Sequence, residues 1–325
     1  MTAASSTADS RARLAIVLVA ILLTAGYYLY SFGFQTVTVS QLEEMASTYL
    51  HEGMAAISRA RAQQLPSVEF SYDINNTGLV GLSWSEITTS GGNLEAKRTA
   101  TDPLWAGTLV RWFTEAGLSK GDVVAAAFSG SFPGLNLAVI SAARALEIDL
   151  VAISSVGASN YGANHPEFTW LDMELALLEA GWPEEYLAQA TAMGGASDLA
   201  RNLGDEGQQL IRSAMARRGV TQLLGTSLSD MSHARLEFLK QAAEGRPISL
   251  YVNVGGASAS TGYCPDWIDI GQGFINSLPN CPGGTQGVMH EMLSQGVPVL
   301  NLLNVRQLAS QAGIPLDRRF QVATP

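Results

Sequence analysis

The sequence predicts an α/β protein with a doubly wound, mostly parallel sheet and a helical insertion. Three observations support this fold class. Strand-like apolar runs alternate with stretches of helical periodicity along the chain, as in α/β proteins. The run Val123–Phe128 is wholly apolar, which is typical of a strand buried on both faces of a parallel sheet. Three of the predicted strands end in loops of small residues, at the edge where open α/β sheets bind ligands.

The composition limits the class of protein. The chain has 325 residues, 47% of them hydrophobic and 15% charged, which suits one large folded domain or two modest ones. Its formal net charge of −10 argues against nucleic acid and anionic lipid as partners, because an acidic protein repels both. An acidic polymer would also be repelled overall, so binding one requires a local basic site.

The N-terminal region predicts a membrane anchor. Residues 14–34 carry no charged side chain and are long enough to span a bilayer. Arg11 and Arg13 precede this run, and no Lys or Arg follows until Arg59, so the positive-inside rule keeps residues 1–13 in the cytoplasm. A cleaved signal peptide is the alternative, although no Ala-x-Ala site follows the apolar run. We therefore expect a single-pass protein of the cell membrane whose main domain is extracytoplasmic.

Residues 35–66 follow the predicted anchor and contain a helix. Ser40–Glu43 has the capping-box pattern, apolar residues recur after it at helical spacing, and Pro66 ends the helix. This segment is either a stalk or the first helix of the domain that extends over residues 67–325.

Two regions of this domain depart from simple strand and helix alternation. Residues 79–101 are polar and contain glycine, which predicts a long loop. Residues 169–217 show helical periodicity broken by Pro183 and by Gly194 and Gly195, which predicts the helical insertion. The other predicted elements are helices at 102–117, 133–146, 229–243, 283–295 and 304–311, and strands at 123–128, 150–154, 248–254 and 297–300.

The segment 120–174 is the most informative part of the chain. An apolar strand runs into Ser129–Ser131, Pro133 occupies the first turn of a helix, and a second apolar strand ends in another serine-rich loop. This pattern is a βαβ unit, so the two loops lie at the same edge of the sheet. The start of the helix favours an anion there, and the hydroxyls add hydrogen-bond donors. The alternative is that Ser131 caps its helix and Gly130 permits the turn.

A second candidate feature is the adjacent basic pair on the predicted loop. Lys97 and Arg98 can receive a carboxylate or a phosphate, and arginine offers a bidentate fork. The alternative is a pair of solvated loop charges. The predicted ligand-binding residues are Lys97, Arg98, Ser129, Gly130, Ser131, Ser154, Ser155, Ser159 and Asn164.

The same loops could carry nucleophilic chemistry. Ser131 or Ser129 would be the nucleophile, and His165 or His233 the base. The Gly-x-Ser-x-Gly motif is absent, because the local sequence is Ser-Gly-Ser-Phe-Pro-Gly. His165 is otherwise a surface loop residue. The sequence thus leaves open whether the protein is a binding module or an enzyme.

The cysteines and the motifs of the sequence limit which metals and cofactors are expected. Cys264 and Cys281 form either a disulfide in an oxidising compartment or two free buried thiols. No Cys or His cluster has metal-ligand spacing, and no Gly-x-x-x-x-Gly-Lys-Ser/Thr motif is present. We expect neither a metal nor a cofactor.

Three runs resemble a known family. They read SEITTSGGNLEAKRTATDP, AFSGSFPGLNLAVISAARAL and ISSVGASNYGANHPEFTWLDME, and are similar to the poly-gamma-glutamate system protein family. Its members are membrane-anchored proteins grouped with poly-gamma-glutamate synthesis genes. The similarity extends over nearly the whole chain after the predicted anchor. It implies an accessory role in synthesis, export or processing of the polymer, with the polymer and the rest of that machinery as partners, but it names no reaction.

Two further functions remain as alternatives. The first is a serine hydrolase or transpeptidase-like enzyme that acts on the polymer. The second follows from Gly121–Ser155, which resembles sugar-isomerase-type phosphosugar-binding domains. Those domains carry Ser-x-Ser-Gly-x-Thr, of which Ser129 and Gly130 match Ser-Gly, whereas Phe132 stands where threonine is expected.

Overall fold

The structure is a computed structural model that describes residues 15–25, 37–265, 270–278 and 281–322. The chain divides into two units, Met1–Thr38 and Val39–Pro325. In the first unit, residues 15–25 are helical. No helix within the described ranges is both long and apolar enough to cross a membrane. Residue 14 and residues 26–34 of the predicted anchor lie outside these ranges.

The second unit is built on a seven-stranded, mostly parallel sheet, as predicted for an α/β protein. Its strands are β2 (Val123–Ser129), β3 (Asp149–Ser155), β7 (Ala190–Ala192), β8 (Thr221–Gln222), β9 (Ile248–Val254), β10 (Gly273–Ile275) and β11 (Val299–Leu302). Their spatial order is β10-β11-β9-β2-β3-β7-β8. All neighbours pair in parallel except β10, which is antiparallel to β11.

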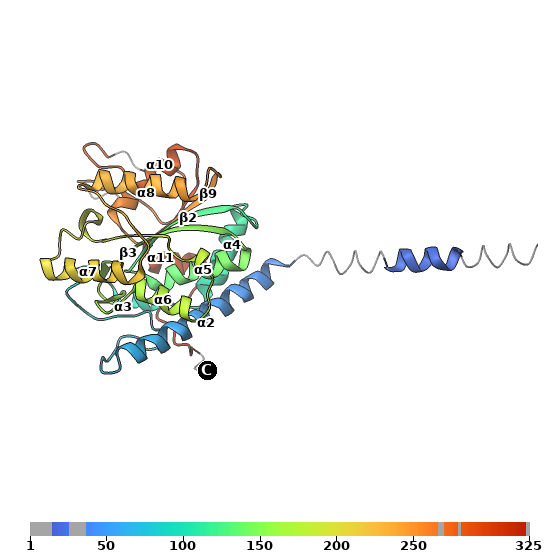
Figure 1. Ribbon diagram of the computed structural model, residues 1–325, viewed down its shortest axis with the longest axis horizontal. Coiled ribbons are helices and arrows are strands. Elements are labelled where there is room, and N and C mark those ends of the chain that lie inside the picture. Colours follow the sequence, from blue (N-terminus) through green and yellow to red (C-terminus); the bar gives the residue numbers. More distant parts are fainter. Residues whose placement is uncertain (1–14, 26–36, 266–269, 279–280, 323–325) are drawn as a thin grey trace, which may run out of the picture. The chain divides into compact units, whose positions relative to one another are not determined.

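Helices cover both faces of this sheet (Figure 1). On one face lie α2 (Val39–Gln64), α4 (Leu104–Glu115), α5 (Pro133–Leu146) and α6 (Trp170–Glu179), and on the other lie α8 (Leu228–Ala242) and α10 (Val288–Ser294). Val124 and Phe128 of β2 pack into the first of these cores, whereas Val123 and Ala127 pack into the second. Both faces of β2 are buried, which explains its unbroken apolar run.

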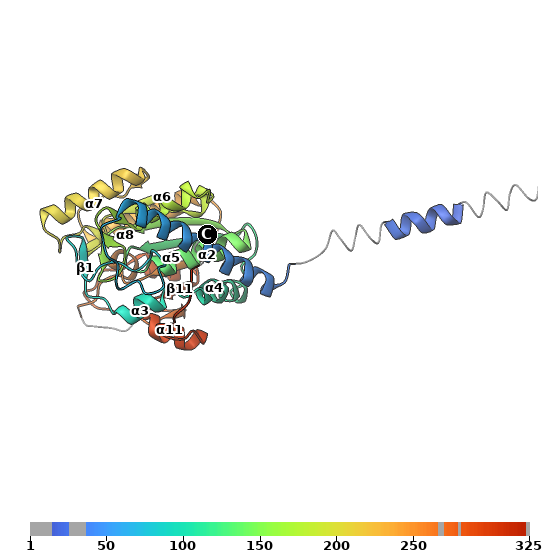
Figure 2. The same cartoon turned by 90° about the horizontal axis from the view of Figure 1, so that it is seen from below.

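Helix α2 belongs to the second unit. It buries Leu50, Met54 and Ile57 in the main core and packs against α4 and α5 (Figure 2). The remaining helices are α3 (Leu94–Thr99), α7 (Asp205–Arg218), α9 (Ser258–Thr261) and α11 (Val305–Ala312). Short elements connect them, namely β1 (Thr88–Ser90), β4 (Ala158–Ser159), β5 (Asn164–His165), β6 (Phe168–Thr169), η1 (Glu184–Tyr186) and η2 (Ala196–Asp198).

The prediction that residues 169–217 form a helical insertion was wrong. This region contains strand β7, and β8 follows it, so the βα alternation continues through to that edge of the sheet. The strand Ala190–Ala192 was missed because three residues are too few to show a period, and alanine is common in helices.

The prediction of a long loop at 79–101 was also wrong in part. It contains β1 and helix α3, and Asn93 caps this helix by accepting a hydrogen bond from the Ala96 N–H at 2.9 Å. Lys97 and Arg98 therefore lie on a helix and not on a solvated loop. Strand β1 pairs in parallel with β4, which attaches this segment to the loop that follows β3.

The connectivity creates a switch point in the middle of the sheet. From β2 the chain continues to β3, β7 and β8 on one side, and then returns to place β9 and β11 on the other side. The loops that follow β2 and β9 consequently diverge from each other at the carboxyl ends of adjacent strands. Ligands of open α/β sheets bind at such a point.

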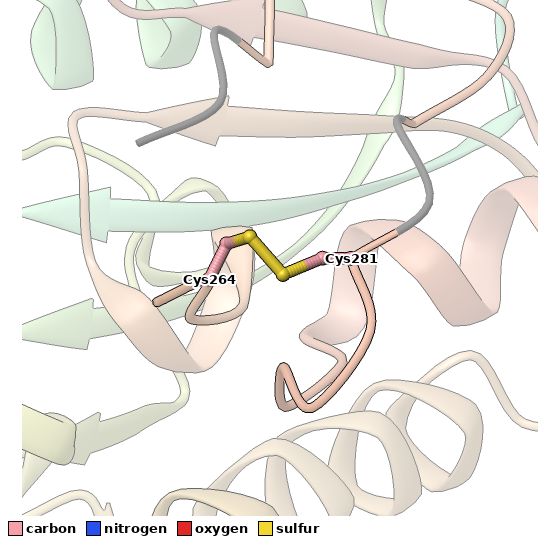
Figure 3. The surroundings of a disulfide bond; sticks show 2 residues. All are labelled: Cys264 and Cys281. Atoms are coloured by element: carbon pink, nitrogen blue, oxygen red, sulfur yellow. A yellow bond between two sulfur atoms is a disulfide. The ribbon is translucent and has the colours of Figure 1, made fainter. Parts of the chain in front are cut away.

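Cys264 and Cys281 form a disulfide, which decides between the two alternatives for these residues (Figure 3). Their Cα atoms are 5.8 Å apart, and the sequence separation is 17 residues. The bond joins the segment after α9 to the segment before α10 and closes a loop that contains β10.

We predict that the double variant Cys264→Ser/Cys281→Ser is less stable by about 3 kcal/mol, because a cross-link over a loop of this length restricts the unfolded chain. Urea denaturation measures the difference. Wild-type protein treated with a reductant should unfold at the same urea concentration as the variant. Equal midpoints for oxidised wild type and variant would contradict the prediction.

Candidate functional site

A cleft of about 640 Å³ lies at the carboxyl edge of the sheet. It is lined by the segments that follow β1, β2, β3, β7, β9 and β11, together with Ala96 and Lys97 of α3 and Asn202. The loops after β2 and β9 are both present, so the cleft occupies the switch point of the sheet. This is the edge that the serine- and glycine-rich strand ends predict.

The charged lining of the cleft is entirely basic. Among the described residues, Lys97 and Arg306 line it and no Asp or Glu does. Arg306 pairs with Glu95 at 2.9 Å on the exposed rim. In a chain of net charge −10, the lining of this cleft is thus a local basic surface, with Glu95 as a carboxylate beside it at the rim.

Lys97 is the buried cation of this cleft. Its side chain is 3% exposed, and its Nζ donates hydrogen bonds to the Ser131 carbonyl and, at 2.7 Å, to Ser159 Oγ. Nζ also lies 3.6 Å from the centre of the Phe132 ring. No carboxylate within the described part of the chain forms an ion pair with it.

The environment of Lys97 weakens its charge. Burial lowers the pKa of Lys97 from an ordinary value of 10.5 to about 7, because the protein interior solvates an ammonium poorly. Both protonation states are therefore populated near neutral pH. The ammonium form suits an anionic ligand, and the neutral amine suits proton abstraction.

The turn after β2 is shaped for this cleft. Ser129 Oγ accepts a hydrogen bond from the Ser131 N–H at 3.1 Å, and the Asn136 side chain bonds the backbone of Ser129. Ser131 does not cap α5, whose N-cap residue is Phe132 and has no side-chain cap. Instead, Ser131 Oγ accepts a hydrogen bond from the Ser159 N–H at 3.0 Å.

Gly130 is required by the close approach of two strand-end loops. It does not itself line the cleft, but a Cβ at this position would lie 2.4 Å from the Val156 carbonyl oxygen. No side chain fits that separation. The glycine therefore permits the loops after β2 and β3 to touch, which brings Ser131 and Ser159 together.

The serines at the end of β3 have structural partners. Ser154 is buried, donates to Glu174 at 2.8 Å, accepts from the Trp170 indole at 3.0 Å, and does not line the cleft. Ser155 lines the cleft, but its hydroxyl donates to Asp198 at 3.0 Å and accepts from Arg235 at 2.6 Å.

Burial raises the pKa of Glu174, whereas it lowers the pKa of Lys97. It raises the pKa of Glu174 to about 7, although Arg218 at 3.2 Å acts against this shift. This carboxyl lies in the core beneath the strand ends, where it orients Ser154.

The structure separates Asn164 and Arg98 from the cleft. The amide of Asn164 bonds both the N–H and the carbonyl of Leu82, at 2.8 and 2.9 Å. Arg98 Nε donates to the Tyr72 carbonyl at 2.7 Å, and its Nη1 lies 3.3 Å from Asp317. Both residues attach neighbouring segments to the domain, and neither lines the cleft.

The histidines do not pair with the predicted nucleophiles. His165 Nδ1 accepts a hydrogen bond from the Glu167 N–H at 3.2 Å, and burial lowers the pKa of His165. His233 is exposed on α8. In the part of the chain that the structure describes, no histidine ring hydrogen-bonds a serine hydroxyl, so Ser129 and Ser131 lack the predicted base.

Sequence reasoning missed part of the lining. The segment after β11, with Asn304 and Arg306, carries no run of small residues and gave no signal. Ser258 belongs to the small-residue loop after β9, and its Oγ is buried without a hydrogen-bond partner among the described residues. This hydroxyl is available to a ligand.

The chain is an α/β protein with a cleft at the switch point of a mostly parallel sheet. No family model, curated protein or solved structure matches it.

We predict that Lys97→Met changes the pH dependence of stability. The pKa of Lys97 is about 7 in the folded protein and about 10.5 in the unfolded chain. As pH decreases between these two values, only the unfolded chain binds a proton at Lys97, so the stability of the wild-type protein falls. The methionine variant lacks this dependence. Its stability relative to wild type should be highest below pH 7 and should decrease as pH rises.

Thermal melts between pH 6 and pH 10 measure this difference. Lys240→Met is the matched control, because Lys240 lies on α8 with a side chain 45% exposed and should melt in parallel with wild type. A difference between Lys97→Met and wild type that stays constant with pH would refute the lowered pKa.

Proposed function

We propose that this protein is a membrane-anchored accessory component of poly-gamma-glutamate synthesis, export or processing, and that its cleft binds carboxylates of the polymer. The observation that carries the binding role is the charge of the cleft, which is lined by Lys97 and Arg306 and by no carboxylate among the described residues. The resemblance to the poly-gamma-glutamate system family supports the pathway. The apolar run at 14–34, with Arg11 and Arg13 before it, supports the anchor.

The cleft offers several groups to a carboxylate. The Lys97 ammonium supplies the charge, and a bound anion would favour its protonated form. Helix α5 begins directly after Ser131 and Phe132, which line the cleft, so the positive end of its dipole lies beside the cleft. The Ser258 hydroxyl, which has no partner among the described residues, adds a donor from the segment after β9.

A polymer with a carboxylate on every residue fits this arrangement. One carboxylate is bound at Lys97, and the next lies towards the exposed rim, where it competes with Glu95 for Arg306. The net negative charge of the protein would repel the rest of the chain. Binding is thereby confined to the cleft, and a strong dependence on salt follows.

We predict that Lys97→Met weakens binding of poly-gamma-glutamate oligomers by about ten- to a hundred-fold, since removal of a charge-assisted hydrogen bond costs about 1.5–3 kcal/mol. Fluorescence anisotropy with the full chain in detergent micelles measures the affinity. Wild-type affinity should also fall as pH rises above about 7, where Lys97 loses its proton.

Two control variants make this test specific. Lys240→Met removes an exposed charge and should leave affinity unchanged. Arg98→Met should lower the melting temperature but not the affinity, because Arg98 bonds Tyr72 and Asp317 outside the cleft. Unchanged affinity in Lys97→Met would remove the binding role, and preferential binding of a sugar phosphate would favour the phosphosugar alternative.

The pathway is tested in cells. Deletion of the gene should change the yield, the length or the surface retention of poly-gamma-glutamate, because the proposal makes the protein part of that machinery. Polymer that is unchanged in all three properties would remove the pathway from the proposal, whatever the cleft binds.

A further inference from the structure

Ser159 is the serine whose hydroxyl contacts the amine of Lys97. The distance from Ser159 Oγ to Lys97 Nζ is 2.7 Å, and both side chains line the cleft. Ser131 meets the same amine through its backbone carbonyl and not through its hydroxyl. The geometry therefore singles out Ser159, a residue for which no histidine is needed as a base.

Lys97 is placed to act as a base and not only as a cation. A lysine is an effective base when burial holds its amine neutral, and burial lowers the pKa of Lys97 to about 7. The Phe132 ring, 3.6 Å from Nζ, excludes water on one side. An exposed lysine would remain protonated and could not accept the serine proton.

The charged groups around Lys97 are already paired. On α3 itself, Glu95 pairs with Arg306 of α11, and Arg98 lies against Asp317. The other segments packed against Lys97 are the turn after β2 and strand β4, and their residues Ser129–Phe132 and Ala158–Ser159 carry no charge. No neighbouring carboxylate thus holds Lys97 in its protonated form.

Both members of the pair are held in position. Strand β4 pairs with β1, where Ser159 lies opposite Ser90, and the Ser159 N–H donates to Ser131 Oγ at 3.0 Å. Lys97 is held by the carbonyl of the same Ser131. Gly92 borders the pair, and a Cβ there would lie 3.3 Å from Ser159 Oγ, so the glycine leaves room beside the hydroxyl.

We propose that Ser159 is a nucleophile and Lys97 its general base, and that the cleft catalyses acyl transfer on an amide bond. The choice of amide, a link within or at the end of a carboxylate-bearing polymer, rests on the proposed function. Serine–lysine pairs perform this chemistry on unrelated folds. The pair replaces the serine–histidine combinations that the sequence suggested.

The proposed acyl transfer has two stages, formation of an acyl ester on Ser159 and its breakdown. Ser159 Oγ bonds to the carbonyl carbon while its proton passes to Lys97 Nζ. The C–N bond then breaks, and the leaving amine takes that proton, which leaves an acyl ester on Ser159. Water or an acceptor amine attacks the ester and gives its proton to Lys97, and the carboxylic acid or new amide departs as Ser159 regains a proton. The positive end of the α5 dipole favours the oxyanion of each tetrahedral intermediate.

A fluorophosphonate probe tests the pair without any assumption about the substrate. On the full chain in detergent micelles, Ser159 Oγ should bond to phosphorus while fluoride leaves, and peptide mass spectrometry should place the label on Ser159. Ser159→Ala should abolish labelling. Lys97→Met should slow it by about a hundred-fold or more, as expected for loss of a general base. Ser213→Ala, on the exposed side of α7, should label like wild type.

The pH dependence separates this role from ligand binding. Labelling should accelerate as pH rises through about 7, whereas carboxylate binding should weaken over the same range. If Ser159→Ala fails to fold, Ser159→Cys preserves the size of the side chain, and it should lose fluorophosphonate labelling and gain alkylation by iodoacetamide.

The outcomes are distinct. Absence of labelling in folded wild type, or labelling that persists in Ser159→Ala, overturns the pair even if the polymer binds. Labelling at Ser159 in a protein that does not bind poly-gamma-glutamate supports the nucleophile and overturns the polymer as its substrate.

Discussion

The burial of a single lysine between two strand-end loops is the constraint on which the cleft depends. Lys97 joins α3 to the Ser131 carbonyl after β2 and to the Ser159 hydroxyl of β4, so three segments distant in sequence meet at one amine. This meeting requires that the loops touch, which only a glycine at position 130 allows. Because an uncompensated buried charge is unfavourable, the arrangement reduces the stability of the fold, and such features are concentrated at functional sites.

A second layer of buried polar groups keeps the end of β3 rigid beneath the cleft. Arg235 pairs with Asp198 at 2.7 Å and bonds Ser155, while Arg218 pairs with Glu174, which bonds Ser154. Buried ion pairs contribute little net stability against apolar replacements, but removal of one partner is severely destabilising. Here these ion pairs hold the helices that flank the end of β3 in position. The hydroxyls of the β3 serines thus bond these buried groups, whereas Ser131 and Ser159 line the cleft next to Lys97.

Much of the fold was accessible from the sequence, and the edge of the sheet that carries the site was too. Strands β2, β3 and β9 can be recognised in the sequence as apolar runs because both of their faces are buried. Ligands of open α/β sheets bind where the connections diverge, and this rule then locates the cleft. The roles of single side chains were not accessible in this way. Lys97 and Arg98 are adjacent on α3 but have different partners, and those of Lys97 lie 34 and 62 positions away, so only tertiary packing reveals that burial lowers the pKa of Lys97. Strands of two or three residues, such as β7 and β8, leave no periodicity to detect.

The disulfide encloses β10, the antiparallel strand that covers the backbone edge of β11. At the opposite edge, β8 is only two residues long and offers little to a passing chain. The cross-link therefore restrains the loop that carries β10 along this edge. Without β10 beside it, the four residues of β11 would present an open backbone edge of the kind that pairs with other strands, so the Cys264–Cys281 bond protects the end of the sheet by limiting the movement of β10.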